Sequence, residues 1–332
     1  MQKRRTMIIS VLLIFIVSTF LVSMTLGTFT MSPAEVFQTF FGLGSSQQEL
    51  VLFQFRLPRM VLAILVGAGL AVSGAILQAL SRNDLADPGI LGINAGAGLA
   101  IVLFIYFFQG SYADLGWSIY LLPMFAFLGA LVAAFLIYTI AWKQGVTPVR
   151  LVLVGIGINA GFMALLIVFQ LRMNPNDFMQ ATIWLTGNIW GSSWTYVLAI
   201  FPWLFVLMLL VLRDANTLNV MRLGDASSVS LGVRVEQVRR RLLVFAVGLA
   251  GASVAAGGAI SFIGLVAPHI ARRLVGPRHG VMIPVAALVG AFFLLFSDMI
   301  ARNVLSPSEI PVGIIVAMIG APYFLYLLMK TA

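Results

Sequence analysis

The sequence contains no cysteine and only two histidines. The lack of cysteine excludes disulfides, thiolate catalysis, iron–sulfur ligation and cysteine-based zinc sites. Neither His269 nor His279 has another histidine close by in the sequence, although a metal site needs three or four ligands. The string G-x-x-x-x-G-K-[ST] is also absent, which excludes a P-loop for ATP. We therefore expect no metal, no cofactor and no enzymatic activity in this chain.

Charge is also scarce. Only 9% of the 332 residues are charged, whereas 61% are hydrophobic, and the mean hydropathy is +1.05. Soluble domains are about 45–50% apolar and about 25% charged, so the sequence predicts an integral membrane protein with a single transmembrane domain, residues 1–332. No room remains for a separate soluble domain. The net charge of +9 indicates basic cytoplasmic loops rather than nucleic-acid binding.

Apolar runs long enough to cross a bilayer, about 20 residues each, set the topology. They cover residues 7–26, 60–80, 90–108, 119–141, 152–170, 196–212, 281–300 and 310–329. The stretch 242–271 has no Asp, Glu, Lys or Arg side chain and is too long for one ordinary span. It contains Gly257-Gly258, a strong helix breaker, which favours two spans.

Positive charge supports this division, because Lys and Arg collect on the cytoplasmic side. With two spans in 242–271, every Lys and Arg lies inside except Arg56, Arg59, Arg172 and Arg302. With one span, more of them lie outside. The sequence therefore predicts an all-α polytopic membrane protein with about ten transmembrane helices and both termini in the cytoplasm.

The sequence contains a G-x-G-x-x-A match, and its apolar runs contain two G-x-x-x-G pairs. Residues 155–160 match G-x-G-x-x-A, but they open a long apolar segment instead of following a strand, so dinucleotide binding is excluded. The pairs Gly92/Gly96 and Gly157/Gly161 each lie on one helical face, and we expect them to serve close helix packing.

Isolated polar residues give little sign of ion-coupled transport. Asp298 lies four residues before Arg302 near an outer span end, which predicts an interfacial ion pair. His269 lies near a cytoplasmic span end, where we expect a structural hydrogen bond or a pivot. Ion-coupled carriers usually place carboxylates within the membrane, so these residues weigh against a secondary transporter.

Two polar features remain. The segment 213–241 is the longest inner loop, with six arginines and interspersed apolar residues, and it predicts short amphipathic helices or a basic surface that binds lipid. Arg56, Arg59 and Arg302 lie outside, around span ends. From composition alone, these three are equally well explained as lipid-headgroup anchors.

Three long blocks point to a family. They are RLPRMVLAILVGAGLAVSGAILQALSRNDLADPGILGINAGAG from Arg56, GGAISFIGLVAPHIARRLVG from Gly257 and SDMIARNVLSPSEIPVGIIVAMIGAPYF from Ser297. Through them nearly the whole chain resembles the permease subunits of iron–siderophore and cobalamin ABC importers, the FecCD family. Asp84 departs from the proline that the family usually has at that position.

The resemblance implies partners and residue roles. The permease pairs with a second copy or a sister permease around a central pathway, rests on two ATPase subunits, and receives an extracytoplasmic substrate-binding protein. Residues 218–235 would couple to the ATPases, with Leu218, Leu223, Gly224, Leu231 and Gly232. The binding protein's glutamates would dock on Arg56, Arg59 and Arg302. The turn 146–149, with Thr147 and Pro148, would form the cytoplasmic gate.

The expected function follows from this resemblance. We expect a multi-pass permease in the lipid bilayer of a bacterial cytoplasmic membrane that translocates a ferric siderophore without changing it covalently. Cobalamin and haem are the alternative cargoes within the same transporter type. An ion-coupled secondary transporter is the rival class.

Overall fold

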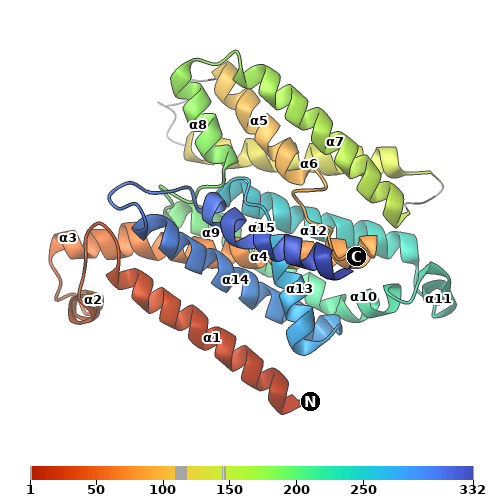
Figure 1. Ribbon diagram of the computed structural model, residues 1–332, viewed down its shortest axis with the longest axis horizontal. Coiled ribbons are helices and arrows are strands. Elements are labelled where there is room, and N and C mark those ends of the chain that lie inside the picture. The colour runs from red at the N-terminus through yellow and green to blue at the C-terminus, as the bar shows by residue number, and fades with distance from the viewer. Residues whose placement is uncertain (1, 109–117, 144, 146, 332) are drawn as a thin grey trace.

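The computed structural model describes residues 2–108, 118–143, 145 and 147–331, and these residues form helices and no strand (Figure 1). The helices in chain order are α1 (Gln2–Thr25), α2 (Pro33–Phe40), α3 (Ser46–Glu49), the π-helical η1 (Leu50–Arg56), α4 (Leu57–Ser81), α5 (Ile93–Phe108), α6 (Ser118–Ala141), α7 (Pro148–Gln170), α8 (Pro175–Leu185), α9 (Trp194–Arg213), α10 (Ala215–Met221), α11 (Asp225–Ser230), α12 (Val235–Gly257), α13 (Ile263–Val275), α14 (His279–Asn303) and α15 (Val312–Thr331).

The all-α membrane architecture is confirmed. Within the described part of the chain, eight helical segments are long and apolar enough to cross a membrane. α5, with 16 residues, is apolar but shorter, and α13 has only 13 residues. The number of ten spans therefore stays a prediction.

The apolar stretch 242–271 divides into two helices, as its glycine pair predicted. α12 ends at Gly257, and Gly258 and Phe262 have φ values of 73° and 68° before α13 begins. Glycine adopts a positive φ without strain, but phenylalanine rarely does. At about 1.5 Å per residue, α13 spans about 20 Å, so it crosses only part of a bilayer core of about 30 Å.

α4 is the central helix of the molecule (Figure 1). Almost every one of its side chains is buried, and it packs against α9, α12, α13 and α14. A Cβ at Gly67 would collide with the carbonyl of Gly290 in α14, and one at Gly74 would collide with the carbonyl of Gly264 in α13. Glycine therefore allows the backbones to approach closely where side chains would separate them.

α5 to α8 form a layer on one side of this central group, and α1 lies on the other (Figure 1). The packing role predicted for Gly92 and Gly96 is confirmed, because their Cβ positions lie close to Asn159 of α7 and to Gly129 of α6. The same prediction is wrong within this chain for Gly157 and Gly161. No described atom lies within 4 Å of either Cβ position, so this face of α7 is open.

The two ends of the molecule differ. α2 and α3 lie at one end, while α10, α11 and both chain termini lie toward the other (Figure 1). The location of both termini in the cytoplasm stays a prediction. Which side faces the cytoplasm stays a prediction.

Candidate functional site

Arg56, Arg59 and Arg302 lie together at the end that carries α2 and α3. Arg56 ends η1, Arg59 lies in the first turn of α4, and Arg302 lies in the last turn of α14. They line a cavity of about 350 Å³ together with Glu309 of the loop before α15. The three arginines are only 5%, 7% and 6% exposed. We call these three residues the outer arginine cluster.

Carboxylates balance part of this positive charge. The Oδ1 atom of Asp298 lies 2.9 Å from both Nε and Nη2 of Arg59, and its Oδ2 atom lies 3.2 Å from Nε of Arg302. Nη1 of Arg59 donates to Oε2 of Glu309 at 2.7 Å. The predicted pair of Asp298 with Arg302 is confirmed. Arg59 joins the same carboxylate from a different helix.

The remaining donors of the cluster point to α1 and the segment after it. Arg56 donates to the carbonyls of Met24 and Phe29. Arg302 also donates to the hydroxyl of Ser23. These guanidinium groups bond to protein atoms and are more than nine-tenths buried, so docking and lipid-headgroup anchoring both stay predictions.

The segment before α12 lies at the opposite end and forms α10 and α11, two short helices of the kind predicted there. Leu218 of α10 is fully buried. Leu223, Val229 and Leu231 are each more than 60% exposed. Several exposed apolar side chains on a short polar segment are typical of a protein–protein contact surface.

Backbone turns and ion pairs fix the position of α11. Gly224 and Gly232 flank it with φ values of 105° and 81°, which favour glycine. Asp225, in its first turn, pairs with Arg82 at the end of α4 and with Arg239 of α12, the latter at 3.0 Å. α11 is therefore tied to two long helices.

The turn before α7 lies beside the same segment. Thr147 is exposed and precedes α7, whose first residue is Pro148. Thr147 and Glu236 of α12 line a common open cavity of about 680 Å³. Glu236 also accepts a hydrogen bond of 3.2 Å from the Tyr138 hydroxyl near the end of α6. Val146, which we also assigned to the gate, lies outside the described residues.

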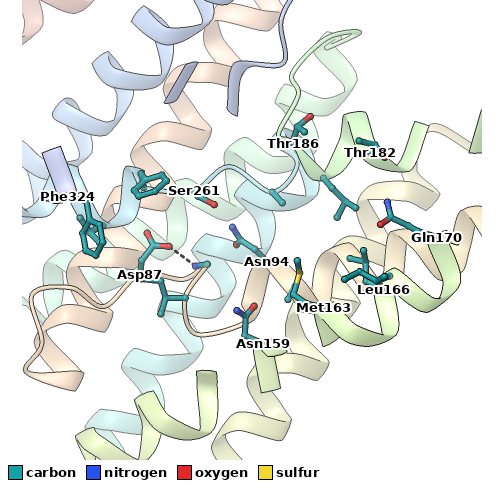
Figure 2. Close-up of a pocket in the computed structure, with 18 of the residues that line it drawn as sticks. Asp87, Asn94, Asn159, Met163, Leu166, Gln170, Thr182, Thr186, Ser261 and Phe324 are labelled. Carbon is teal, nitrogen blue, oxygen red and sulfur yellow. Dashed lines mark hydrogen bonds between the residues drawn. The ribbon is translucent and has the colours of Figure 1, made fainter. Parts of the chain in front are cut away.

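A third cavity, of about 690 Å³, lies between α5, α7, α8, α15 and the chain before α13 (Figure 2). We call it the amide cavity, after its polar lining. Apolar walls from Met163, Leu166 and Phe324 face that lining. Its polar residues are Asp87, Asn94, Asn159, Gln170, Thr182, Thr186 and Ser261.

Asp87 organises one wall of the amide cavity. Its Oδ1 atom accepts a 2.7 Å hydrogen bond from the Gly89 N–H (Figure 2). Burial raises the pKa of Asp87 to about 6, although hydrogen bonds from the backbone N–H groups of Gly89, Ile90 and Leu265 oppose this rise. Because Leu265 lies in the first turn of α13, the carboxylate joins the loop after α4 to the start of that helix.

Asn94 supplies an open acceptor. Its Nδ2 atom donates to the Ile260 carbonyl at 3.2 Å, while its buried Oδ1 atom has no hydrogen-bond partner among the described residues. A buried acceptor without a partner is costly. A ligand in the cavity would satisfy it.

None of these polar residues was predicted to belong to a site. Asn159 belongs to the glycine motif that we excluded as a nucleotide site, and Asn94 and Gln170 are isolated polar residues at the ends of apolar runs. Uncharged polar residues at membrane depth often mark a substrate pathway. That signal was available, but the residues lie far apart along the chain.

His269 makes a contact with α15. Nδ1 of His269 lies 2.8 Å from the Tyr323 hydroxyl, which confirms the expected structural hydrogen bond. Among the described residues, no three His, Cys, Asp or Glu side chains lie close enough together to hold a metal ion.

Long apolar helices, charged clusters at opposite ends and a polar cavity between helices define a multi-pass membrane transport protein. Comparisons agree with this class. The chain matches the model of the FecCD transport family over residues 12–330. It is 57% identical over 324 residues to the iron(3+)-hydroxamate import system permease protein FhuG of Bacillus subtilis, an alignment that covers 97% of this chain and 96% of that protein.

Two further comparisons also cover nearly the whole chain. The iron-uptake system permease protein FeuC of Bacillus subtilis is 41% identical over 338 residues, covering 99% of this chain and 98% of that protein. A solved inward-facing structure, described as an ABC transporter of the metal-chelate type, has a TM-score of 0.86 and 31% identity, covering 98% of this chain and 99% of that one. This protein therefore belongs to the FecCD transport family, as the sequence blocks predicted, and is a multi-pass protein of the cytoplasmic membrane.

Proposed function

We propose that this protein is the membrane-spanning permease of an ABC importer that moves a ferric hydroxamate siderophore into the cell. The observation that carries the proposal is the 57% identity, over almost the full length of both chains, with an iron(3+)-hydroxamate import permease. Separate ATPase subunits would supply the energy, since the sequence has no P-loop.

The amide cavity supports the choice of cargo. Its lining offers amide and hydroxyl groups, and its one carboxylate, Asp87, accepts several backbone N–H groups. A ferric trihydroxamate is uncharged, because three hydroxamate anions balance Fe³⁺, and it presents an oxygen-rich surface. Haem carries two propionates, which a cationic lining would suit better, and no Lys or Arg lines this cavity.

The outer arginine cluster would receive the substrate-binding protein. Three arginines against two carboxylates leave positive charge at the outer end, which attracts the glutamates expected on that partner. Arg56 is held by backbone carbonyls, whereas Arg59 and Arg302 both pair with Asp298, so the charge of Arg56 is the least neutralised of the three.

α10 and α11 would couple the permease to its two ATPases. The exposed Leu223, Val229 and Leu231 give an apolar contact surface, and Asp225 ties α11 to α4 and α12. Motion of the ATPases would thereby reach the long helices directly.

The turn at Thr147 and Pro148 would close the pathway on the cytoplasmic side when it meets the same turn of a second permease. Thr147 is exposed and lies beside the coupling segment across the open cavity. Alternating access would follow from exchange between states in which this turn or the outer end is open.

Uptake of radio-iron ferrichrome, a hydroxamate chelate, tests the function. In cells whose only hydroxamate permease is this chain, uptake should require the gene and should be blocked by excess unlabelled ferrichrome but not by haem or cobalamin. Asn159→Leu, which removes an amide from the cavity, should lower uptake while the protein remains in the membrane. If haem or cobalamin blocks uptake instead, that compound and not a ferric hydroxamate is the cargo.

A further inference from the structure

Glu309 makes a contact that the proposed docking role does not require. It lies in the loop between α14 and α15, and its Oε2 atom accepts a hydrogen bond of 2.7 Å from Nη1 of Arg59. Its side chain is 30% exposed, whereas that of Asp298, the other carboxylate on Arg59, is fully buried. The two carboxylates of the cluster therefore differ in how easily they can leave.

Buried charge explains why a carboxylate is needed there. Arg59 and Arg302 share Asp298, and Arg59 turns its remaining Nη1 atom toward Glu309 at the cavity. Two buried arginines that share one carboxylate keep a net positive charge, which is costly inside a protein. Glu309 thus supplies the second counter-charge of the cluster in the free permease.

We propose that Glu309 is an internal competitor that occupies the position on Arg59 which a carboxylate of the docking protein takes. The inference rests on the proposed docking role of the outer arginine cluster. Docking would exchange one carboxylate for another on Nη1 of Arg59, while Asp298 keeps its place between Arg59 and Arg302. Glu309 therefore lowers the affinity of the permease for the docking protein, because a partner carboxylate must first displace it from Arg59.

The position of Glu309 fits displacement. Glu309 contacts Nη1 of Arg59, whereas Asp298 contacts two arginines. It lies outside any helix, three residues before α15 begins at Val312. A loop side chain that is partly exposed exchanges partners more easily than a buried helical one. Release of Glu309 would therefore remove a side-chain contact of the loop before α15, while the backbone hydrogen bond from the Ile310 N–H to the Ala301 carbonyl would remain.

The test compares two neutral variants in the purified permease–ATPase complex, titrated with the soluble substrate-binding protein of the same import system. Glu309→Gln should bind it about three- to tenfold more tightly than wild type, because the competing charge is gone. Glu49→Gln is the matched control. Glu49 is an exposed glutamate of α3 at the same end, outside the cavity, and its loss should leave affinity unchanged.

The direction in which Glu309→Gln changes the affinity for the binding protein separates the competitor role from a purely structural one. If Glu309 only held Arg59 in place, Glu309→Gln would weaken binding, as Arg59→Gln should, and the competitor role would be overturned. Unchanged affinity in Glu309→Gln, with weaker binding in Arg56→Gln and Arg59→Gln, would also overturn it but would leave docking intact. If neither arginine variant alters affinity, the docking role fails, and this inference fails with it.

A second measurement reports the displacement itself. The chain has no native cysteine, so Ser308→Cys, an exposed position next to Glu309, accepts a single spin label. The label should become more mobile when the binding protein is added. The same addition should change little when Glu309→Gln is already present. A label that stays equally immobile on docking in the wild-type background would contradict release of Glu309.

Discussion

Asp298 holds two cations at the outer end and has no exposed surface. It lies within 3.2 Å of Arg302 and 2.9 Å of Arg59. Replacement by asparagine leaves both arginines buried without their shared anion. We expect Asp298→Asn to lower the free energy of unfolding by about 3–5 kcal/mol, measured as thermal or denaturant unfolding of the detergent-solubilised protein.

Glu309→Gln is the control for that prediction. Its side chain is 30% exposed, and Arg59 keeps Asp298 as its buried counter-ion when Glu309 is neutral. This variant should therefore lose less stability than Asp298→Asn. Equal loss of stability in both variants would contradict the central role given to Asp298.

Asp87 makes stability depend on pH. Its pKa in the folded protein, about 6, lies above the ordinary value of 3.8 because the group is buried. The folded state therefore binds the proton more tightly, and the stability contribution of this group falls as pH rises from about 4 to 6.

Asparagine at this position removes the titration. The stability of wild type relative to Asp87→Asn should decrease over pH 4 to 6 and then level off, measured as melting temperature in detergent at a series of pH values. A difference that does not vary over this range would contradict burial of an ionisable carboxyl group at Asp87.

The same residues show the limits of sequence reasoning. The pair of Asp298 and Arg302 was predictable, because residues four apart share a helix face. Their contact with Arg59 was not, since it depends on how α4 packs against α14. The amide cavity was not predictable for the same reason. Its polar groups come together only through the packing of α5, α7 and the chain before α13.

α11 and its flanking turns carry the proposed coupling of the permease to its ATPases. Leu231 is 62% exposed after the end of α11, and an aspartate there would bring charge into an interface that needs apolar contact. Leu231→Asp should insert normally but lose ATPase binding and uptake.

Co-purification of the ATPase with the tagged permease measures this effect. Leu43→Asp is the control, because Leu43 is 76% exposed between α2 and α3, at the opposite end. It should retain the ATPase. Normal ATPase binding and uptake in Leu231→Asp would exclude α11 from coupling.

Some element boundaries were predictable and others were not. Gly257 and Gly258 indicated the break between α12 and α13, and the mixed composition of 213–241 indicated short helices. α8 was not predicted as a helix, because its 11 residues are only partly apolar. Asn174 begins it by accepting a hydrogen bond from the Asp177 N–H. This is a helix-capping signal, which hydropathy alone does not reveal.

The proposed gate would require a second permease. Cysteine at Thr147 is the only thiol in an otherwise cysteine-free chain. Thr147→Cys should cross-link between two copies when the cytoplasmic side is closed and should not when it is open, as read by gel mobility with and without nucleotide. Leu43→Cys, at the other end, should not cross-link. No cross-link at Thr147 in any nucleotide state would place the gate elsewhere.

α4 links the two ends of the molecule. It is a single helix of 25 residues, about 37 Å long, with Arg59 in its first turn and Arg82 directly after its end. One stiff element thus joins the outer arginine cluster to α11. If ATP binding inside changes the affinity for the protein docked outside, docking must change the affinity for ATP by the same factor, because the two equilibria share one thermodynamic cycle. Bound partner outside would then be sensed by the ATPases before any cargo has moved.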